Sequence, residues 1–76
     1  METGLDRVRP GAVAVVTQVN TTPELRHRLK AFGLVPGTKV CCRYRCPWGH
    51  VTAIALRGSV LALRTEDLRK IRVLCQ

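Results

Sequence analysis

A helix stop followed directly by a Pro-Gly turn lies near the middle of the chain and constrains its fold more than any other segment. Residues 28–37 read RLKAFGLVPG. Gly33 is typical of the left-handed residue that ends a helix. Residues 35–38 fit a type II turn, with Pro36 at its second position and Gly37 at its third. Because the rest of the chain predicts short strands, this one helix and its exit turn decide how the strands can be arranged.

The residues before the stop predict a short amphipathic helix. Thr22 can cap it, with Pro23 at the first helical position, where the missing N–H leaves no hydrogen bond unmade. Thr21 with Glu24 offers a competing capping-box register. A single apolar stripe then recurs at helical spacing, formed by Leu25, Leu29 and Phe32.

Short runs of alternating or apolar residues predict five strands, over residues 12–19, 39–46, 50–56, 59–64 and 72–75. The first run is apolar on both faces, which indicates a central strand. In the second, Val40, Cys42, Tyr44 and Cys46 alternate with more polar neighbours, and residues 65–67 predict one further helical turn. The pattern therefore predicts a mainly β fold, a small antiparallel β-barrel with one inserted short α-helix. Residues 1–76 form a single domain, since a chain of this length supports one core.

The charge of the chain predicts an anionic partner. Lys and Arg number 13 against five acids, which gives a formal net charge of +8. Nucleic acid, phospholipid head groups or an acidic protein face would each be attracted. A purely solubilising charge is the alternative. Only three aromatic residues are present, so binding of single strands by base stacking is not favoured.

The expected location is the cytoplasm. No apolar run approaches the roughly 18 residues that a membrane-spanning helix needs. The polar N-terminal residues, which include Glu2 and Asp6, do not resemble a secretory signal. Without an extracellular context the four cysteines are expected to be reduced thiols.

The thiols suggest a metal site, but their spacing argues against one. Cys42 and Cys46 lie four residues apart in one predicted strand, about 13 Å at the usual rise. Two thiolates on one zinc lie within about 4 Å of each other. Cys46 with His50, across the intervening loop and assisted by Cys75, is the best remaining pair. We therefore expect no metal site and no cofactor, with adventitious binding of a divalent metal at most.

Catalysis is not expected either. A nucleophilic cysteine needs a nearby base and a formed pocket. Cys46 and His50 could meet, but the sequence offers no third group to orient them. The chain is therefore predicted not to be an enzyme.

Three blocks of the sequence resemble the FeoA family, small cytosolic proteins of bacterial ferrous-iron uptake. Residues 29–37 are similar to the family pattern Leu-x-x-Met/Leu-Gly-Leu-x-Pro-Gly. Pro47-x-Gly49 matches in the middle hairpin, and the third block is ALRxxDxxxIxV over residues 62–73. The resemblance implies an SH3-like barrel and a non-enzymatic accessory role. It also implies association with the cytoplasmic part of FeoB, the ferrous-iron transporter that carries a GTP-binding domain.

A protein-binding surface is the favoured site. The helix exit and the loop that carries Trp48 present side chains that could anchor a partner, and two arginines could steer it. The predicted contact residues are Phe32, Leu34, Val35, Trp48, Arg43 and Arg45. Core packing is the alternative for Phe32 and Leu34, and for Trp48 the alternative is a loop that covers the barrel mouth.

Two other functions compete with this one. The charge favours a small basic barrel that binds nucleic acid. A metal-responsive SH3-like domain, like those attached to metal-dependent repressors, is the third candidate. We do not expect these 76 residues to include the DNA-binding domain that such repressors carry. A homo-oligomer through an open barrel edge is a further expectation.

Overall fold

The fold is described by a computed structural model covering residues 1–46 and 50–76. The strands are β1 (Glu2–Gly4), β2 (Val13–Val19), β3 (Lys39–Arg45), β4 (Val51–Leu56), β5 (Ser59–Arg64) and β6 (Ile71–Cys75). A 3₁₀ turn, η1 (Leu5–Arg7), follows β1. The helices are α1 (Pro23–Ala31) and α2 (Thr65–Leu68).

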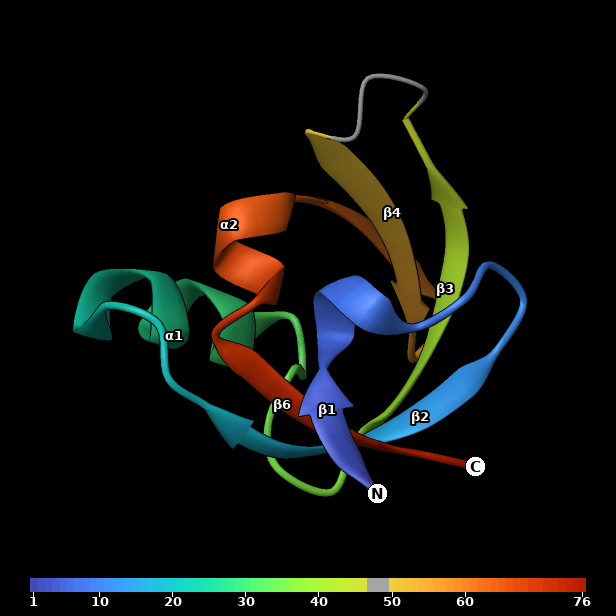
Figure 1. The fold of residues 1–76 in the computed structure, drawn as a ribbon. Coiled ribbons are helices and arrows are strands. Elements are labelled where there is room, and N and C mark those ends of the chain that lie inside the picture. The colour runs from blue at the N-terminus through green and yellow to red at the C-terminus, as the bar shows by residue number, and fades with distance from the viewer. Residues whose placement is uncertain (47–49) are drawn as a thin grey trace.

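The strands form one bent antiparallel sheet in the order β1-β6-β2-β3-β4-β5 (Figure 1). Helix α1 is inserted between β2 and β3, as predicted. Strand β2 lies between β6 and β3, so its apolar residues on both faces do mark a central strand. Strands β1 and β5 are the two edges of the sheet, which curves like a barrel without being closed by hydrogen bonds between them.

Strand β1 was not expected from the sequence. Its three residues are too few and too polar to give a strand pattern. Pairing with β6 holds it in register, with Glu2 opposite Leu74 and Gly4 opposite Arg72. The sheet therefore has six strands where the pattern predicted five.

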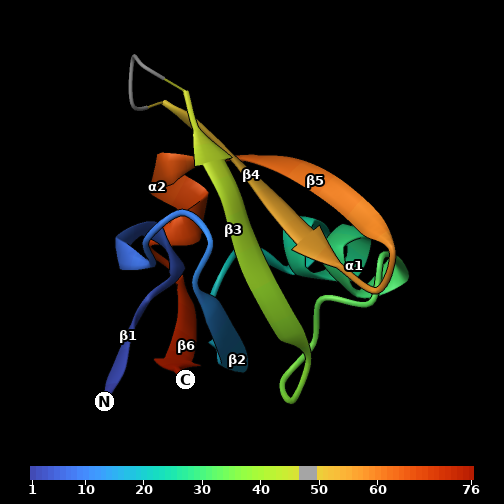
Figure 2. The same ribbon diagram turned by 90° about the vertical axis from the view of Figure 1, so that its right-hand side faces the viewer.

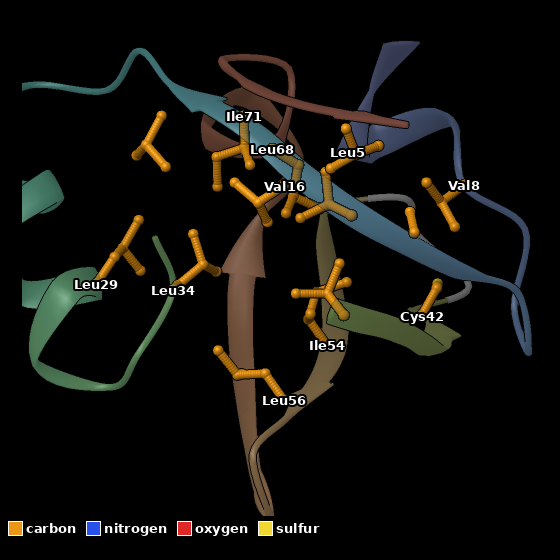
Figure 3. Close-up of a cluster of buried hydrophobic side chains, with 14 residues drawn as sticks. Leu5, Val8, Val16, Leu29, Leu34, Cys42, Ile54, Leu56, Leu68 and Ile71 are labelled. Atoms are coloured by element: carbon orange, nitrogen blue, oxygen red, sulfur yellow. The ribbon is translucent and has the colours of Figure 1, made fainter. Parts of the chain in front are cut away.

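One apolar core fills the concave side of the sheet (Figure 3). Every element except β1 and β5 contributes a buried residue to it, and Leu61 and Leu63 of β5 pack against it while partly buried. Its members are Leu5, Val8, Ala14, Val16, Val19, Leu29, Leu34, Val40, Cys42, Ile54, Leu56, Leu68, Ile71 and Val73.

Helix α1 begins and ends with hydrogen-bonded caps. The Thr22 hydroxyl accepts from the N–H of Leu25 at 3.3 Å, so the Thr22 register forms. At the other end the N–H of Leu34 donates to the carbonyl of Leu29 at 3.0 Å, and Gly33 to Lys30 at 2.9 Å. These two bonds make a Schellman motif, whose usual apolar contact is supplied here by two core leucines.

The predicted Pro-Gly turn is present and is bonded to β2. The Thr38 N–H donates to the Val35 carbonyl at 3.0 Å, and Gly37 has φ +95°. The Gly37 N–H also donates to the carbonyl of Val16 at 2.7 Å. The Thr38 hydroxyl is buried and donates to the carbonyl of Gly33 at 2.7 Å, which fixes the turn to the helix end.

A bulge in β3 overturns the expected alternation of that strand. Cys42 faces Ile54 but Tyr44 faces Ala53, so one extra residue is accommodated at Arg43. Tyr44 is consequently 64% exposed instead of joining Val40 and Cys42 on the inner face.

Candidate partner-binding surface

The residues predicted at the helix exit fall into different environments. Phe32 is the C-cap of α1 and is 53% exposed. Leu34 is only 1% exposed, because the Schellman turn directs it into the core, so its prediction as a contact residue was wrong. Val35, at the start of the Pro-Gly turn, is half-buried. Of these three side chains, Phe32 is the most accessible to a partner.

The two predicted steering arginines also differ. Arg43 lies at the bulge and is exposed. The Arg45 guanidinium instead donates to the carbonyl oxygens of Asp6 at 2.6 Å and Val8 at 2.7 Å. Arg45 therefore has an intramolecular role that the sequence did not suggest. Trp48 lies outside the described residues.

Phe32 and residues of β5 line the same apolar groove. It has a volume of about 190 Å³. Its lining from α1 and the helix cap is Leu25, Arg28, Leu29 and Phe32, and from β5 it is Leu61, Ala62 and Leu63. We call this the α1–β5 groove.

The β5 residues of this groove were predicted only as part of a strand. Leu61 and Leu63 were expected to face inward, and both do pack against the core while remaining half-buried. Their part in a groove follows from the position of α1, which no local pattern specifies. The available signal was the absence of charge and proline between Val60 and Leu63.

Charges of both signs surround the groove. Arg28 lines its apolar part. The adjoining depression along β5 has a volume of about 470 Å³, and its charged residues are Glu24, Arg28, Arg64, Glu66 and Asp67. Arg64 and Glu66 form an exposed ion pair at 3.8 Å.

At the opposite edge a polar network joins β1, β2 and β6. The Thr17 hydroxyl donates to the Glu2 carboxylate at 2.7 Å, and the Arg72 guanidinium lies 3.3 Å from the same group. Hydrogen bonds from Thr17 and then Arg72 lower the pKa of the Glu2 carboxyl. This network holds the short edge strand β1 in place. The Glu2 carboxylate is hydrogen-bonded to Thr17 and paired with Arg72.

The thiols form no metal centre within residues 1–46 and 50–76. No three His, Cys, Asp or Glu side chains of this part of the chain are placed to hold an ion. Cys42 is buried, whereas Cys46 is half-buried beyond the bulge, and its N–H donates to the Val51 carbonyl at 2.9 Å. Because the bulge interrupts the alternation between Cys42 and Cys46, these residues do not share a strand face in the way the spacing assumed. His50 is exposed.

Neither helix in the described part of the chain is long and apolar enough to cross a membrane.

The bent sheet, the helix inserted after β2 and the apolar surface groove together define a small SH3-like module. The chain belongs to the FeoA family, since the FeoA domain model matches residues 3–74. Comparison with curated proteins gives no match.

Solved structures support this assignment. The FeoA protein from Chlorobium tepidum is 30% identical, with a TM-score of 0.93, and the match covers 96% of this chain and 70% of that one. A FeoA-like protein from Clostridium acetobutylicum is 27% identical, with a TM-score of 0.84, over 97% of this chain and 86% of the other.

A further likeness, to a larger protein, extends to the fold alone. T. acidophilum IdeR is 17% identical, with a TM-score of 0.85, and the match covers 99% of this chain but 34% of that protein. The chain therefore shares an SH3-like fold with one part of that larger protein.

Proposed function

We propose that this chain is an accessory protein of bacterial ferrous-iron uptake that binds the cytoplasmic part of a FeoB-type transporter. Membership of the FeoA family supports the iron-uptake role. On this proposal the protein works in the cytoplasm and reaches the membrane only through its partner. Its contribution is recognition and regulation, without catalysis or a resident cofactor.

The half-exposed Phe32 at the α1–β5 groove carries the binding part of the proposal. A rigid aromatic side chain beside an apolar groove is a common anchor at protein interfaces. The Schellman motif fixes the main chain at Phe32, so little main-chain entropy is lost when this residue is covered. Exposed arginines around it would speed the approach of an acidic partner.

The experiment is a calorimetric titration of this chain with the purified cytoplasmic domain of the transporter. We expect a one-to-one complex, and Phe32→Ser should weaken it at least about tenfold, since anchor residues contribute about 2 kcal/mol or more. Tyr44→Ser is the matched control, because Tyr44 is a comparably exposed aromatic residue that does not line the groove. Equal affinity for all three proteins, or no complex at all, would count against the proposal.

Binding of nucleic acid is the second candidate, favoured by the net charge of +8. Affinity for duplex DNA should then fall with salt, with a log–log slope of about −0.9 per phosphate contacted. A steep slope together with no binding to the transporter domain would favour nucleic-acid binding over transporter binding as the function of this chain.

A further inference from the structure

The two edges of the sheet differ in how they are protected. Strand β1 is only three residues long, and its Glu2 is bonded to Thr17 and Arg72. Strand β5 is twice as long and runs Ser-Val-Leu-Ala-Leu-Arg. Its register with β4 has no bulge. Proteins normally interrupt such an edge with charge, proline or a bulge, because an uninterrupted apolar edge can pair with another strand.

The main-chain groups that β5 offers follow from its hairpin. The turn has two residues, Arg57 with φ 46° and Gly58 with φ 79°, and Leu56 is paired with Ser59. In such a hairpin the residues next to the turn exchange hydrogen bonds, and pairing then alternates along the strand. The N–H and C=O groups of Val60 and Ala62 therefore point away from β4. In the described part of the chain β5 pairs with β4 alone.

Strand β5 runs beside α1 (Figure 2), and residues of both elements line the α1–β5 groove. Ala62, in the middle of the edge, lines the groove, and Leu25 and Phe32 line it from the helix and its cap. An extended segment lying there would bond to β5 through its main chain and bury its side chains against the helix. Domains that recognise peptides by strand addition use this combination of edge and pocket.

Charge decides between a second copy of the chain and another protein as the occupant. Antiparallel pairing of two β5 strands would bring Arg57 of each copy towards Arg64 of the other. Each copy also carries a net charge of +8. Like charges opposed across an edge are destabilising. Self-pairing is therefore disfavoured, and a segment with an acidic residue is favoured, because Arg28 is the charged member of the groove lining.

We propose that β5 receives an extended segment of the partner protein as an added strand. The segment has alternating apolar side chains and an acidic residue placed beside Arg28. This inference rests on the proposed function, because it takes the transporter's cytoplasmic domain as the partner. It specifies the kind of contact: main-chain pairing to Val60 and Ala62, with side chains in the α1–β5 groove.

Amide hydrogen exchange of the ¹⁵N-labelled chain, alone and with the unlabelled transporter domain, tests the pairing directly. Strand addition should slow exchange at Val60 and Ala62 at least about tenfold, since their amides are otherwise open to solvent. Leu61 donates towards β4 in both states, so its amide serves as the internal reference. A complex that leaves Val60 and Ala62 exchanging as before would overturn strand addition while the proposed function stands.

A proline variant provides the second readout. Ala62→Pro removes the outward N–H but no bond to β4, and proline is tolerated on edge strands. It should weaken the complex about tenfold, the equivalent of one main-chain hydrogen bond. Ala62→Glu covers the case of a misfolded proline variant, because it adds a negative charge to the edge, which opposes an acidic segment, and should also weaken the complex. Wild-type affinity in a folded Ala62→Pro protein would contradict the inference.

Two further outcomes are separable from these. No complex and no change at any amide would overturn the proposed function and strand addition together. Protection of Val60 and Ala62 in the chain alone, with a dimer in sedimentation, would overturn the choice of occupant in favour of a second copy.

Discussion

The guanidinium of Arg45 donates a hydrogen bond of 2.6 Å to the main-chain carbonyl of Asp6. A second bond, of 2.7 Å, reaches the carbonyl of Val8. These bonds tie the end of β3, beyond its bulge, to the turn that follows β1. Arg45, which was predicted from the sequence to contact a partner, therefore links two parts of the barrel.

Replacing Arg45 should lower the stability of the barrel. Arg45→Met keeps much of the aliphatic stem but removes both hydrogen bonds, and each bond from a charged donor contributes about 1.5–3 kcal/mol when well made. Because Arg45 is exposed, we expect a smaller loss in total, about 1–2 kcal/mol in the free energy of unfolding. Urea denaturation measures it. Arg43→Met, at the neighbouring exposed position, should change stability by no more than about 0.5 kcal/mol. Equal effects of the two variants would refute the structural role of Arg45.

Substitutions of Leu34 and Phe32 should differ in their effect on stability, because Leu34 lies in the core and Phe32 is half-exposed. Leu34→Ala leaves a cavity in the core and should cost about 2–5 kcal/mol. Phe32→Ala removes a half-exposed side chain and should cost clearly less, about 1 kcal/mol. Thermal or urea unfolding of the two variants makes the comparison. A larger loss for Phe32→Ala would mean that the helix exit is packed differently.

A side chain at Gly33 should be destabilising, for two separate reasons. Its φ is +90°, and an added Cβ would stand 2.8 Å from the Cδ of Arg57. Gly33→Ala is expected to lower the free energy of unfolding by about 1–3 kcal/mol.

Gly37→Ala is the matched control for this substitution, since its φ is +95° and no atom lies within 4 Å of the added Cβ. Gly37→Ala should lower the free energy of unfolding only through the strain of placing a side chain at positive φ. Shortening the neighbour with Arg57→Asn should restore part of the Gly33→Ala loss, which a double-mutant cycle measures. Additive effects would show that the close approach contributes nothing.

Stability should depend on pH through Glu2. Hydrogen bonds from Thr17 and then Arg72 lower its pKa from the ordinary value of 4.5. The group therefore stabilises the fold above pH 4.5, and this contribution is lost as the pH falls through the lower pKa of the folded state. The stability difference between wild type and Glu2→Gln should be largest near neutral pH and vanish in acid. Glu66→Gln, at an exposed carboxylate, is the control, and a difference that grows in acid would have the wrong sign.

Features fixed by neighbouring residues could be predicted from the sequence. The Thr22 cap, the left-handed Gly33 and the turn through Gly37 each depend on hydrogen bonds within a few residues. The same holds for the short helix α2, which begins at Thr65. In these places local chemistry and the final fold agree, so the pattern was sufficient.

Features fixed by distant contacts could not be predicted. Strand β1 exists because it pairs with β6, some seventy residues away, as in the Glu2–Leu74 pair. The bulge at Arg43 shifts Tyr44 outward without any turn residue to announce it. The groove beside Phe32 requires the placement of α1 against β5. The candidate surface was therefore only partly predictable, through Phe32 and its helix exit.

The pairing of β1 with β6 has a consequence for how the chain could be rearranged. Glu2 lies opposite Leu74, so the first and last strands are neighbours and the two ends of the chain lie on the same side of the molecule (Figure 1). A few linking residues could join them, and new ends could be opened at the exposed turn around Gly11. The neighbours of every strand would be unchanged in such a circular permutant. We therefore expect such a permutant to form the same sheet, with β5 still free to receive a strand.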